Sequence, residues 1–539
     1  MLKDLRFPFL LTITITVCAI WFLPIIPRDE TRYVSVAWEM WTRESFLVPL
    51  LNGMPYSHKP PLLFWLIDLS WYLFGVNEIG IRIIPMLFSL FNIFLVYKIS
   101  LNLDPKKTKT AAYASILLTA TLIWQIWSFA IMFDMLETFW ALTGIYGILL
   151  AVKENGLRGW FLISISIAGG LLTKGPVILV HILPPLLFTF LWNDKLPASQ
   201  TTWYAKTLLS LVTGIAIALL WVIPASIEGG EAYRNAILWG QTSNRIISSF
   251  AHKRSFLWYV PVLVLLFFPW IFFKLFWPTR SAIQTIIKTI KTDRTTKFCL
   301  VWFISSLLIF SLISGKQIHY LLPSLPAMIL LLAHNIEFVF DSKNNLPFKF
   351  IGVGTAYIAL AAICLLLPFV KIDWNAHFFT LVFISPVLLS LGLFFLFYKF
   401  RSVSAAIKSI ALSTTILIFC VLLISHQRFF GRYDIKHLSE IIKEKMDQGV
   451  TVANVGTYFG QYQFLGRLNK PVIELDRDKQ KIENFINNNP DCLILDYVYI
   501  QDNKQIEKYK IIYRQPYENK DAVLWKGAEY LKFLSSQNF

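Results

Sequence analysis

The chain has 539 residues, of which 56% are hydrophobic and only 15% charged, with a mean hydropathy of +0.56 and a formal net charge of +17. A soluble protein would carry about a quarter charged residues, so a soluble globular fold is excluded. Lys and Arg are spread over short loops between apolar runs, which is typical of the positive-inside rule and excludes nucleic acid as the partner. The composition therefore predicts an α-helical polytopic membrane protein.

Apolar runs of about 17–22 residues recur from residue 8 to residue 425, and an α-helix of that length crosses a bilayer. No small-residue cleavage site precedes Pro27, so we expect the first run to be a retained span rather than a signal peptide. We expect about thirteen transmembrane helices, at residues 8–26, 80–101, 111–129, 136–152, 159–173, 176–192, 207–226, 256–274, 298–314, 320–338, 349–370, 378–398 and 408–425.

Two shorter apolar segments follow the first span, and we expect both to be helices at the membrane interface. Residues 61–74 are rich in Trp and too short to cross the bilayer. Residues 29–42 place Tyr33 and Trp41 on one apolar face, while Glu39 falls outside that face.

The distribution of cations predicts the orientation. With the N-terminus inside, Lys and Arg gather in the even-numbered turns, which we therefore assign to the cytoplasm. The opposite face is poor in cations, with exceptions. Cations that break the topology rule need another reason to be there, and binding a phosphate is one. The exceptions are Arg28, Arg32, Arg43, Lys59, Lys174, Arg234, Arg245, Lys253, Arg254 and Lys316.

After residue 425 the composition becomes mixed and polar. Helical patterns at 433–448 and 477–488 alternate with apolar runs at 450–455, 492–495 and 522–525. We expect two domains: a transmembrane domain over 1–425, and a small α/β domain over 426–539 that an odd number of spans places on the outer, periplasmic side. None of the five cysteines forms a CxxC pair, so neither a disulfide nor a cysteine metal site is expected.

A carboxylate pair opens the first outer loop, directly after Pro27. One interpretation is that Asp29 and Glu30 favour the start of a helix by capping it. The other is that Asp29 is a general base, with Arg32 one turn away and able to share its face. An enzyme that takes a sugar from an anionic lipid phosphate needs both a base for the acceptor and cations for the leaving phosphate.

Two lysines lie close to the predicted membrane plane. Lys59 precedes Pro60 and Pro61, which stiffen the backbone, and it could hold a lipid phosphate or be a snorkelling anchor. Lys174 lies between two spans with almost no loop, where a charge is costly unless it is used. Asp134 reads as an isolated acid between apolar runs; it could pair with one of these cations or orient Asp29.

Two further outer segments carry polar residues. Tyr320 enters a predicted span and could donate a hydrogen bond to a phosphate or belong to an aromatic belt. The loop at 227–255, which contains Arg245, has the length and polarity of a substrate lid. There is no P-loop, Rossmann fingerprint or HExxH motif, so the sequence gives no support for a soluble activated donor.

Taken in order, these residues resemble the polyprenyl-phosphate-sugar glycosyltransferases of the aminoarabinose transferase and protein mannosyltransferase superfamily, which have the GT-C fold. The motifs that carry the resemblance are Asp-Glu-Thr-Arg-Tyr at 29–33, Lys-Pro at 59–60, Asp134, Thr-Lys-Gly at 173–175, Phe-Pro-Trp at 268–270 and Tyr-Leu-Leu-Pro at 320–323. The combination is specific, although each motif alone is weak.

The resemblance implies roles for these residues. Asp29 would be the catalytic carboxylate and Asp134 a second essential acid. The substrate-binding residues would be Arg32, Lys59, Lys174, Tyr320, Arg245 and Glu30. The sequence departs from the aminoarabinose enzymes at His58, where they have Glu, and at 239–242, where they have Trp-Glu-Glu-His. These departures bear on a bound metal, so no zinc site is carried over; no cofactor is assigned and a divalent metal is left open.

We therefore expect an inverting transferase in a bacterial inner membrane. It would move a sugar from undecaprenyl phosphate to lipid A or another envelope glycolipid on the periplasmic face, in contact with membrane lipids. Transfer to protein is the first alternative. A lipid flippase or transporter is the second, and it would be expected to show paired halves or broken helices, neither of which the sequence shows.

Overall fold

The computed structural model describes residues 2–536 apart from 155, 195, 197, 241–253, 273–291, 341–348, 367–377, 427–429 and 500–505. The chain divides into two compact units. The first comprises residues 1–21, 57–63 and 77–423, and the second comprises 22–56, 64–76 and 424–539.

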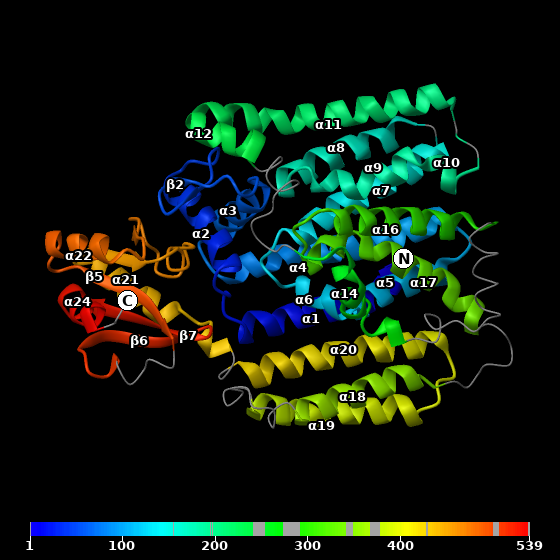
Figure 1. The fold of residues 1–539 in the computed structure, drawn as a ribbon. Helices are drawn as coiled ribbons and strands as arrows, with labels where there is room; N and C mark the ends of the chain where they lie inside the picture. The colour runs from blue at the N-terminus through cyan, green and yellow to red at the C-terminus, as the bar shows by residue number, and fades with distance from the viewer. Residues whose placement is uncertain are drawn as a thin grey trace. The chain divides into compact units, whose positions relative to one another are not determined.

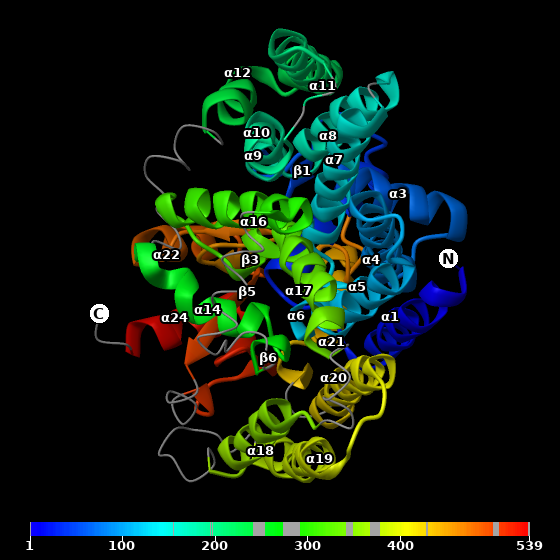
Figure 2. The ribbon, with the colours of Figure 1, turned by 90° about the vertical axis from the view of Figure 1, so that its right-hand side faces the viewer.

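The first unit is helical throughout its described part. Its α-helices are α1 (Leu2–Phe22), α4 (Ile79–Leu103), α5 (Thr108–Ala120), α6 (Leu122–Trp127), α7 (Asp134–Glu154), α8 (Leu157–Lys174), α9 (Val177–Leu187), α10 (Thr189–Trp192), α11 (Gln200–Glu228), α12 (Gly230–Asn235), α14 (Tyr259–Leu266), α16 (Arg294–Leu312), α17 (Leu325–Phe340), α18 (Ile351–Leu366), α19 (Phe378–Phe397) and α20 (Val403–Ser425). Short π or 3-10 turns are η1 (Ala236–Gly240), η2 (Phe256–Trp258), η3 (Trp270–Phe272) and η5 (Ile318–Ser324). Figures 1 and 2 show α18, α19 and α20 lying side by side.

Within the described ranges, seven helical stretches are long and apolar enough to cross a membrane: Leu2–Phe22, Ile79–Leu103, Asp134–Glu154, Gln200–Glu228, Arg294–Leu312, Ile318–Ile336 and Val403–Leu423. A helical membrane protein is thereby confirmed, while the number of spans stays a prediction. All five cysteines are free.

Three segments that we predicted as continuous spans are broken. The segment 111–129 forms α5 and α6, and 176–192 forms α9 and α10. The segment 256–274 contains η2, α14 and η3, and α14 ends at Leu266, just before Pro269. Proline has no N–H to donate and disfavours helical backbone in the residue before it, which accounts for the last break. The expectation that the sequence contains no broken helices was therefore wrong.

The hairpin of α7 and α8 positions part of the site. A Cβ atom added at Gly159 on α8 would lie only 2.6 Å from the carbonyl oxygen of Gly147 and 2.5 Å from the backbone N of Ala151, both on α7. Small residues let two helix backbones approach this closely in a membrane. The close antiparallel packing brings the first residue of α7, Asp134, beside the last residue of α8, Lys174.

The second unit contains α2 (Asp29–Thr42), the short strands β1 (Leu50–Leu51) and β2 (Met54–Pro55), most of α3 (Leu62–Phe74), and the C-terminal region. That region has η7 (Phe430–Arg432), α21 (Lys436–Asp447), α22 (Lys479–Asn488) and α24 (Gly527–Ser536). Its sheet comprises β3 (Val452–Val455), β4 (Ile473–Leu475), β5 (Leu493–Tyr499), β6 (Ile511–Tyr517) and β7 (Lys520–Lys526), of which β5, β6 and β7 are labelled in Figure 1.

The five strands are ordered β4-β3-β5-β7-β6. β3 pairs in parallel with β4 and β5, whereas β7 pairs antiparallel with β5 and β6. The predicted α/β fold of this region is confirmed, including α21, α22 and the strands at 452–455, 493–499 and 520–526. The sequence analysis missed β4, β6 and α24.

Nearly every residue of α2 between Glu30 and Met40 is buried. Ser35 Oγ donates to the Gly460 carbonyl at 2.6 Å, and Trp38 Nε1 donates to the Leu468 carbonyl at 2.9 Å. Glu39, which the helical pattern placed away from the apolar face, is also buried, and its carboxylate accepts the backbone N–H groups of Asn52 and Gly53. The C-terminal region therefore holds α2 through hydrogen bonds as well as apolar contacts.

Candidate functional site

The predicted site residues fall into two groups. Lys59, Asp134, Lys174 and Tyr320 are in the first unit, and Asp29, Glu30 and Arg32 are in the second. The remaining predicted residue, Arg245, and most of the predicted lid lie outside the described residues.

A buried ion pair forms the centre of the first group. Lys174 Nζ donates to Asp134 Oδ1 at 2.6 Å, with 7% and 1% of the two side chains exposed. Gly175 follows Lys174 with φ of 77°, which ends α8 directly after the lysine. Of the two expectations for Asp134, pairing with a cation is the one that the structure shows.

His319 and Tyr320, on η5, complete the surroundings of this pair. His319 Nε2 lies 4.0 Å from Asp134 Oδ1, and Lys174 Nζ lies 5.3 Å from the centre of the Tyr320 ring. That geometry is within the range of a cation–π contact. Tyr320 therefore contacts the buried lysine through its ring; donation of its hydroxyl to a phosphate stays a prediction.

Lys59 belongs to the same cluster. Its Nζ lies 5.7 Å from the centre of the Phe133 ring, next to Asp134 in the chain, and its charge acts on Asp134. The side chain is only partly buried. The structure thus gathers two of the predicted cations, Lys59 and Lys174, around one buried carboxylate.

Sequence reasoning missed one acid here. Glu137 lies one turn after Asp134 on α7, so describing Asp134 as isolated was wrong. Its side chain is fully buried, and neither carboxylate oxygen has a hydrogen-bond partner among the described residues. The signal was present as acids at i and i+3 in one turn, which places both on the same helix face.

In the second group, Arg32 donates to the carboxylate of Asp29. The Asp29 side chain is 55% exposed and that of Arg32 19%. The Arg32 guanidinium also lies 5.3 Å from the centre of the Tyr33 ring, and its buried Nε has no hydrogen-bond partner in the described part of the chain. Burial alone would lower the pKa of Arg32, but Tyr56, Tyr33 and Asp29 together raise it, so this side chain stays cationic.

The capping interpretation of Asp29 has no support in hydrogen bonding. The N-cap of α2 is Arg28, with φ of 77°, and no side chain caps the helix. Glu30 is buried, and its Oε2 accepts the backbone N–H of Ile26 at 3.0 Å, which ties the preceding loop to the helix. Of the two acids, Asp29 has the exposed carboxylate.

The described residues contain no group of three His, Cys, Asp or Glu side chains that could hold a metal ion. The buried cation Lys316, another exception to the topology rule, donates to the carbonyls of Arg254 and Ile313, so it ties loop backbone together.

Comparison with known proteins supplies the context for this geometry. A family model described as dolichyl-phosphate-mannose-protein mannosyltransferase matches residues 58–227. Two relatives, from Erwinia tasmaniensis and Proteus mirabilis, are both 26% identical to this chain, over 346 residues for the first and 360 for the second. Both are described as undecaprenyl phosphate-alpha-4-amino-4-deoxy-L-arabinose arabinosyl transferases. These matches cover 63% of this chain in both cases, and 61% and 63% of the relatives, so the chain spans less than two thirds of their length.

A solved structure extends the likeness to the whole chain. ArnT from Cupriavidus metallidurans, in a crystal structure bound to undecaprenyl phosphate, has a TM-score of 0.75 at 15% identity and covers 96% of this chain and 97% of its own. The resemblance inferred from the motifs is confirmed. The chain has the aminoarabinose transferase, or GT-C, fold with its small C-terminal α/β region, as predicted.

Proposed function

We propose that the chain is a membrane glycosyltransferase that moves a sugar from undecaprenyl phosphate to lipid A or another envelope glycolipid. The cluster of Lys59 and Lys174 around Asp134 carries this proposal, because a lipid phosphate that leaves with a full negative charge needs cations beside it. The similarity to aminoarabinose transferases supports a donor of this class.

The chemistry needs one displacement. The acceptor hydroxyl oxygen bonds to the anomeric carbon as the bond from that carbon to the phosphate oxygen breaks, which inverts the anomeric centre. Asp29 takes the hydroxyl proton, and its exposed carboxylate supports that role. Arg32, Lys59 and Lys174 stabilise the leaving phosphate, and Asp134 holds Lys174 in place. Tyr320, Arg245 and Glu30 are proposed to bind substrate.

The reaction is proposed to take place on the periplasmic side of the membrane. Residues 1–425 form the catalytic transmembrane domain in a bacterial inner membrane, and residues 426–539 form a periplasmic domain. The loop charges support this orientation, since Lys and Arg gather in the loops assigned to the cytoplasm.

Transfer to protein is the second candidate. The match of residues 58–227 to a protein mannosyltransferase model favours it, because that model covers Lys59, Asp134 and Lys174. The two candidates share the donor and the mechanism and differ only in the acceptor.

Mass spectrometry of lipid A and of envelope glycoproteins, from cells with and without this protein, tests the proposal. A sugar mass that appears on lipid A or another glycolipid only with the protein is the expected result. A sugar on protein alone would select the second candidate. Identical lipids and glycoproteins in the two strains would contradict both.

A further inference from the structure

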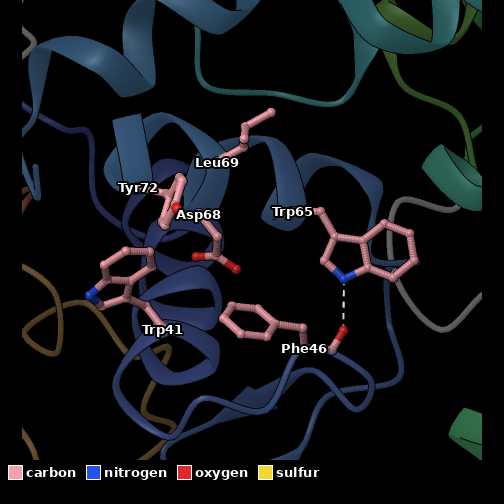
Figure 3. Close-up of a pocket in the computed structure, with 6 residues that line it drawn as sticks. All are labelled: Trp41, Phe46, Trp65, Asp68, Leu69 and Tyr72. Carbon is pink, nitrogen blue, oxygen red and sulfur yellow. Dashed lines mark hydrogen bonds between the residues drawn. The ribbon is translucent and has the colours of Figure 1, made fainter. Parts of the chain in front are cut away.

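An open pocket of about 400 Å³ in the second unit has no role in the reaction proposed above. Its walls are almost entirely apolar and aromatic: Trp41 from the end of α2, Phe46 from the loop that follows, and Trp65, Leu69 and Tyr72 from α3. Trp65 Nε1 donates to the Phe46 carbonyl at 2.7 Å, which fixes two of the walls together (Figure 3).

Among the described lining residues, Asp68 alone carries a carboxylate, and its two oxygens lie behind the aromatic walls rather than on the open surface of the pocket. Figure 3 shows this carboxylate pointing among the rings of Trp41, Phe46 and Tyr72. Asp68 is only 5% exposed, and neither of its oxygens has a hydrogen-bond partner among the described residues. A buried acid without a partner is costly, so a ligand that supplies donors and a positive charge would relieve that cost.

The surroundings specify the chemistry of this ligand. Aromatic faces attract organic cations, and a carboxylate with two unused oxygens accepts hydrogen bonds from N–H donors. A primary ammonium satisfies both, whereas a quaternary ammonium has no N–H to donate. An anion would be repelled.

The outer face of α3 indicates that the ammonium belongs to a lipid. Large apolar side chains stay exposed there, including Leu69 at 51%, Tyr72 at 77% and Phe74 at 74%. A short helix with such a face lies in the membrane interface, at the depth of lipid headgroups. Trp41, in the wall of the pocket, and Asp29 lie at opposite ends of α2, about 18 Å apart at a rise of 1.5 Å per residue. The occupant of the pocket is therefore not the reacting sugar.

We propose that this pocket binds the primary ammonium of a phosphatidylethanolamine headgroup, with Asp68 as its counter-charge and the aromatic walls around it. The binding would seat α3 on a zwitterionic lipid of the bilayer. This site is independent of the proposed transferase activity, so it can fail while that activity stands.

Native mass spectrometry of the purified full chain tests the proposal, with phosphatidylethanolamine and its N-acetylated form of identical acyl chains as probes. The N-acetyl lipid keeps the shape of the headgroup and loses the ammonium. We expect the wild-type chain to bind phosphatidylethanolamine at least about tenfold more tightly than the N-acetyl lipid. One charge-assisted hydrogen bond produces a difference in affinity of this size. Equal binding of the two lipids by the wild-type chain would overturn the proposal, and this comparison needs no variant.

The variant Asp68→Asn keeps the shape of the side chain and removes its charge. It should lose the preference for the ammonium, whereas Glu44→Gln, at an exposed acid of the same unit, should keep it. An unchanged preference in a folded Asp68→Asn protein would overturn the proposal.

The dependence of this lipid preference on pH is a second test of Asp68. Burial raises the pKa of Asp68 to about 8, and Tyr72 is the only other titratable side chain among the described residues of the lining. Because a bound cation favours the ionised carboxylate, the preference should strengthen as the pH rises from 7 to 8, by at most about tenfold per unit. Asp68→Asn should show no such rise, and a pH-independent preference in the wild-type chain would count against Asp68.

Discussion

Asp29 and Asp134 are held in opposite ways. Asp134 is 1% exposed and bound to Lys174, whereas Asp29 is 55% exposed and paired with Arg32 on one side. A buried carboxylate in an ion pair suits positioning of the lysine, and an accessible one suits proton transfer to and from a substrate.

We expect Asp29→Asn to fold and to bind the polyprenyl donor, yet to lose about 10²–10⁴-fold in transfer rate, because the amide cannot take the acceptor's proton. Turnover and thermal stability should be measured on the same preparation. A loss of activity that merely follows a loss of folded protein would reduce Asp29 to a structural role. If Asp134→Asn were inactive and Asp29→Asn only slow, the roles of the two acids would be exchanged.

The cations proposed to bind the donor phosphate separate into two kinds. Lys59→Ala and Arg32→Ala should weaken donor binding by about 10–100-fold each, since a charge-assisted contact is worth roughly 1.5–3 kcal/mol. The exposed Lys470→Ala is the control and should bind as the wild type. Wild-type donor affinity in both Lys59→Ala and Arg32→Ala would show that neither residue binds the donor phosphate.

Lys174 should behave differently, because its loss leaves Asp134 buried without its partner. Lys174→Ala should therefore lower stability by about 3–5 kcal/mol in addition to impairing donor use. The double variant Asp134→Asn/Lys174→Gln should recover part of the stability and none of the activity. If Lys174→Ala had the same denaturation midpoint as the wild type, the ion pair of Lys174 and Asp134 would not contribute to stability.

For single residues, the sequence was enough to predict members of the site but not the contacts that they make. Lys174 and Asp134 stood out as charges in apolar surroundings, and they do meet. Glu137 was missed because it was read as part of the helix, and Asp68 because one acid in an apolar helix gives no sign that its partner is absent. Such absences are properties of the packed structure.

Among the elements, the hairpin of α7 and α8 depends on a close backbone approach. Gly159→Ala should force the two helices apart, since its Cβ would lie 2.5 Å from the backbone N of Ala151. We expect a Tm lower by several degrees and reduced donor use through displacement of Lys174 from Asp134. Gly156→Ala is a matched control, because the nearest atom to its Cβ is 3.9 Å away. Equal melting temperatures for the two variants would contradict the packing account.

Element boundaries show where sequence periodicity is informative. The helix at 29–42 was predicted at its observed bounds, because its apolar positions recur with the helical period. The breaks within 111–129 and 176–192 were not predicted, since hydropathy averages over a turn and does not register a single non-helical residue. Strands β4 and β6 were missed because they carry little apolar alternation.

For the whole molecule, the orientation in the membrane is the prediction with the widest consequences. An alkaline phosphatase fusion after residue 430 should be active and one after residue 290 inactive, because the loop charges place the former outside and the latter in the cytoplasm. The reverse pattern would put Asp29 and the C-terminal region in the cytoplasm and would contradict a periplasmic reaction.

The composition predicted the fold class, and the order of the motifs predicted the resemblance to aminoarabinose transferases. Broken helices also occur here, so that feature does not separate a transferase from a flippase. Consumption of the donor distinguishes a transferase from a flippase.

Reconstitution with an undecaprenyl-phosphate sugar tests the central claim most directly. Free undecaprenyl phosphate and glycosylated acceptor should appear together, in equal amounts, with the wild-type chain and lipid A, and almost none of either with Asp29→Asn. A donor that binds, or crosses the bilayer, without being consumed in the presence of any glycolipid or protein acceptor would contradict a transferase.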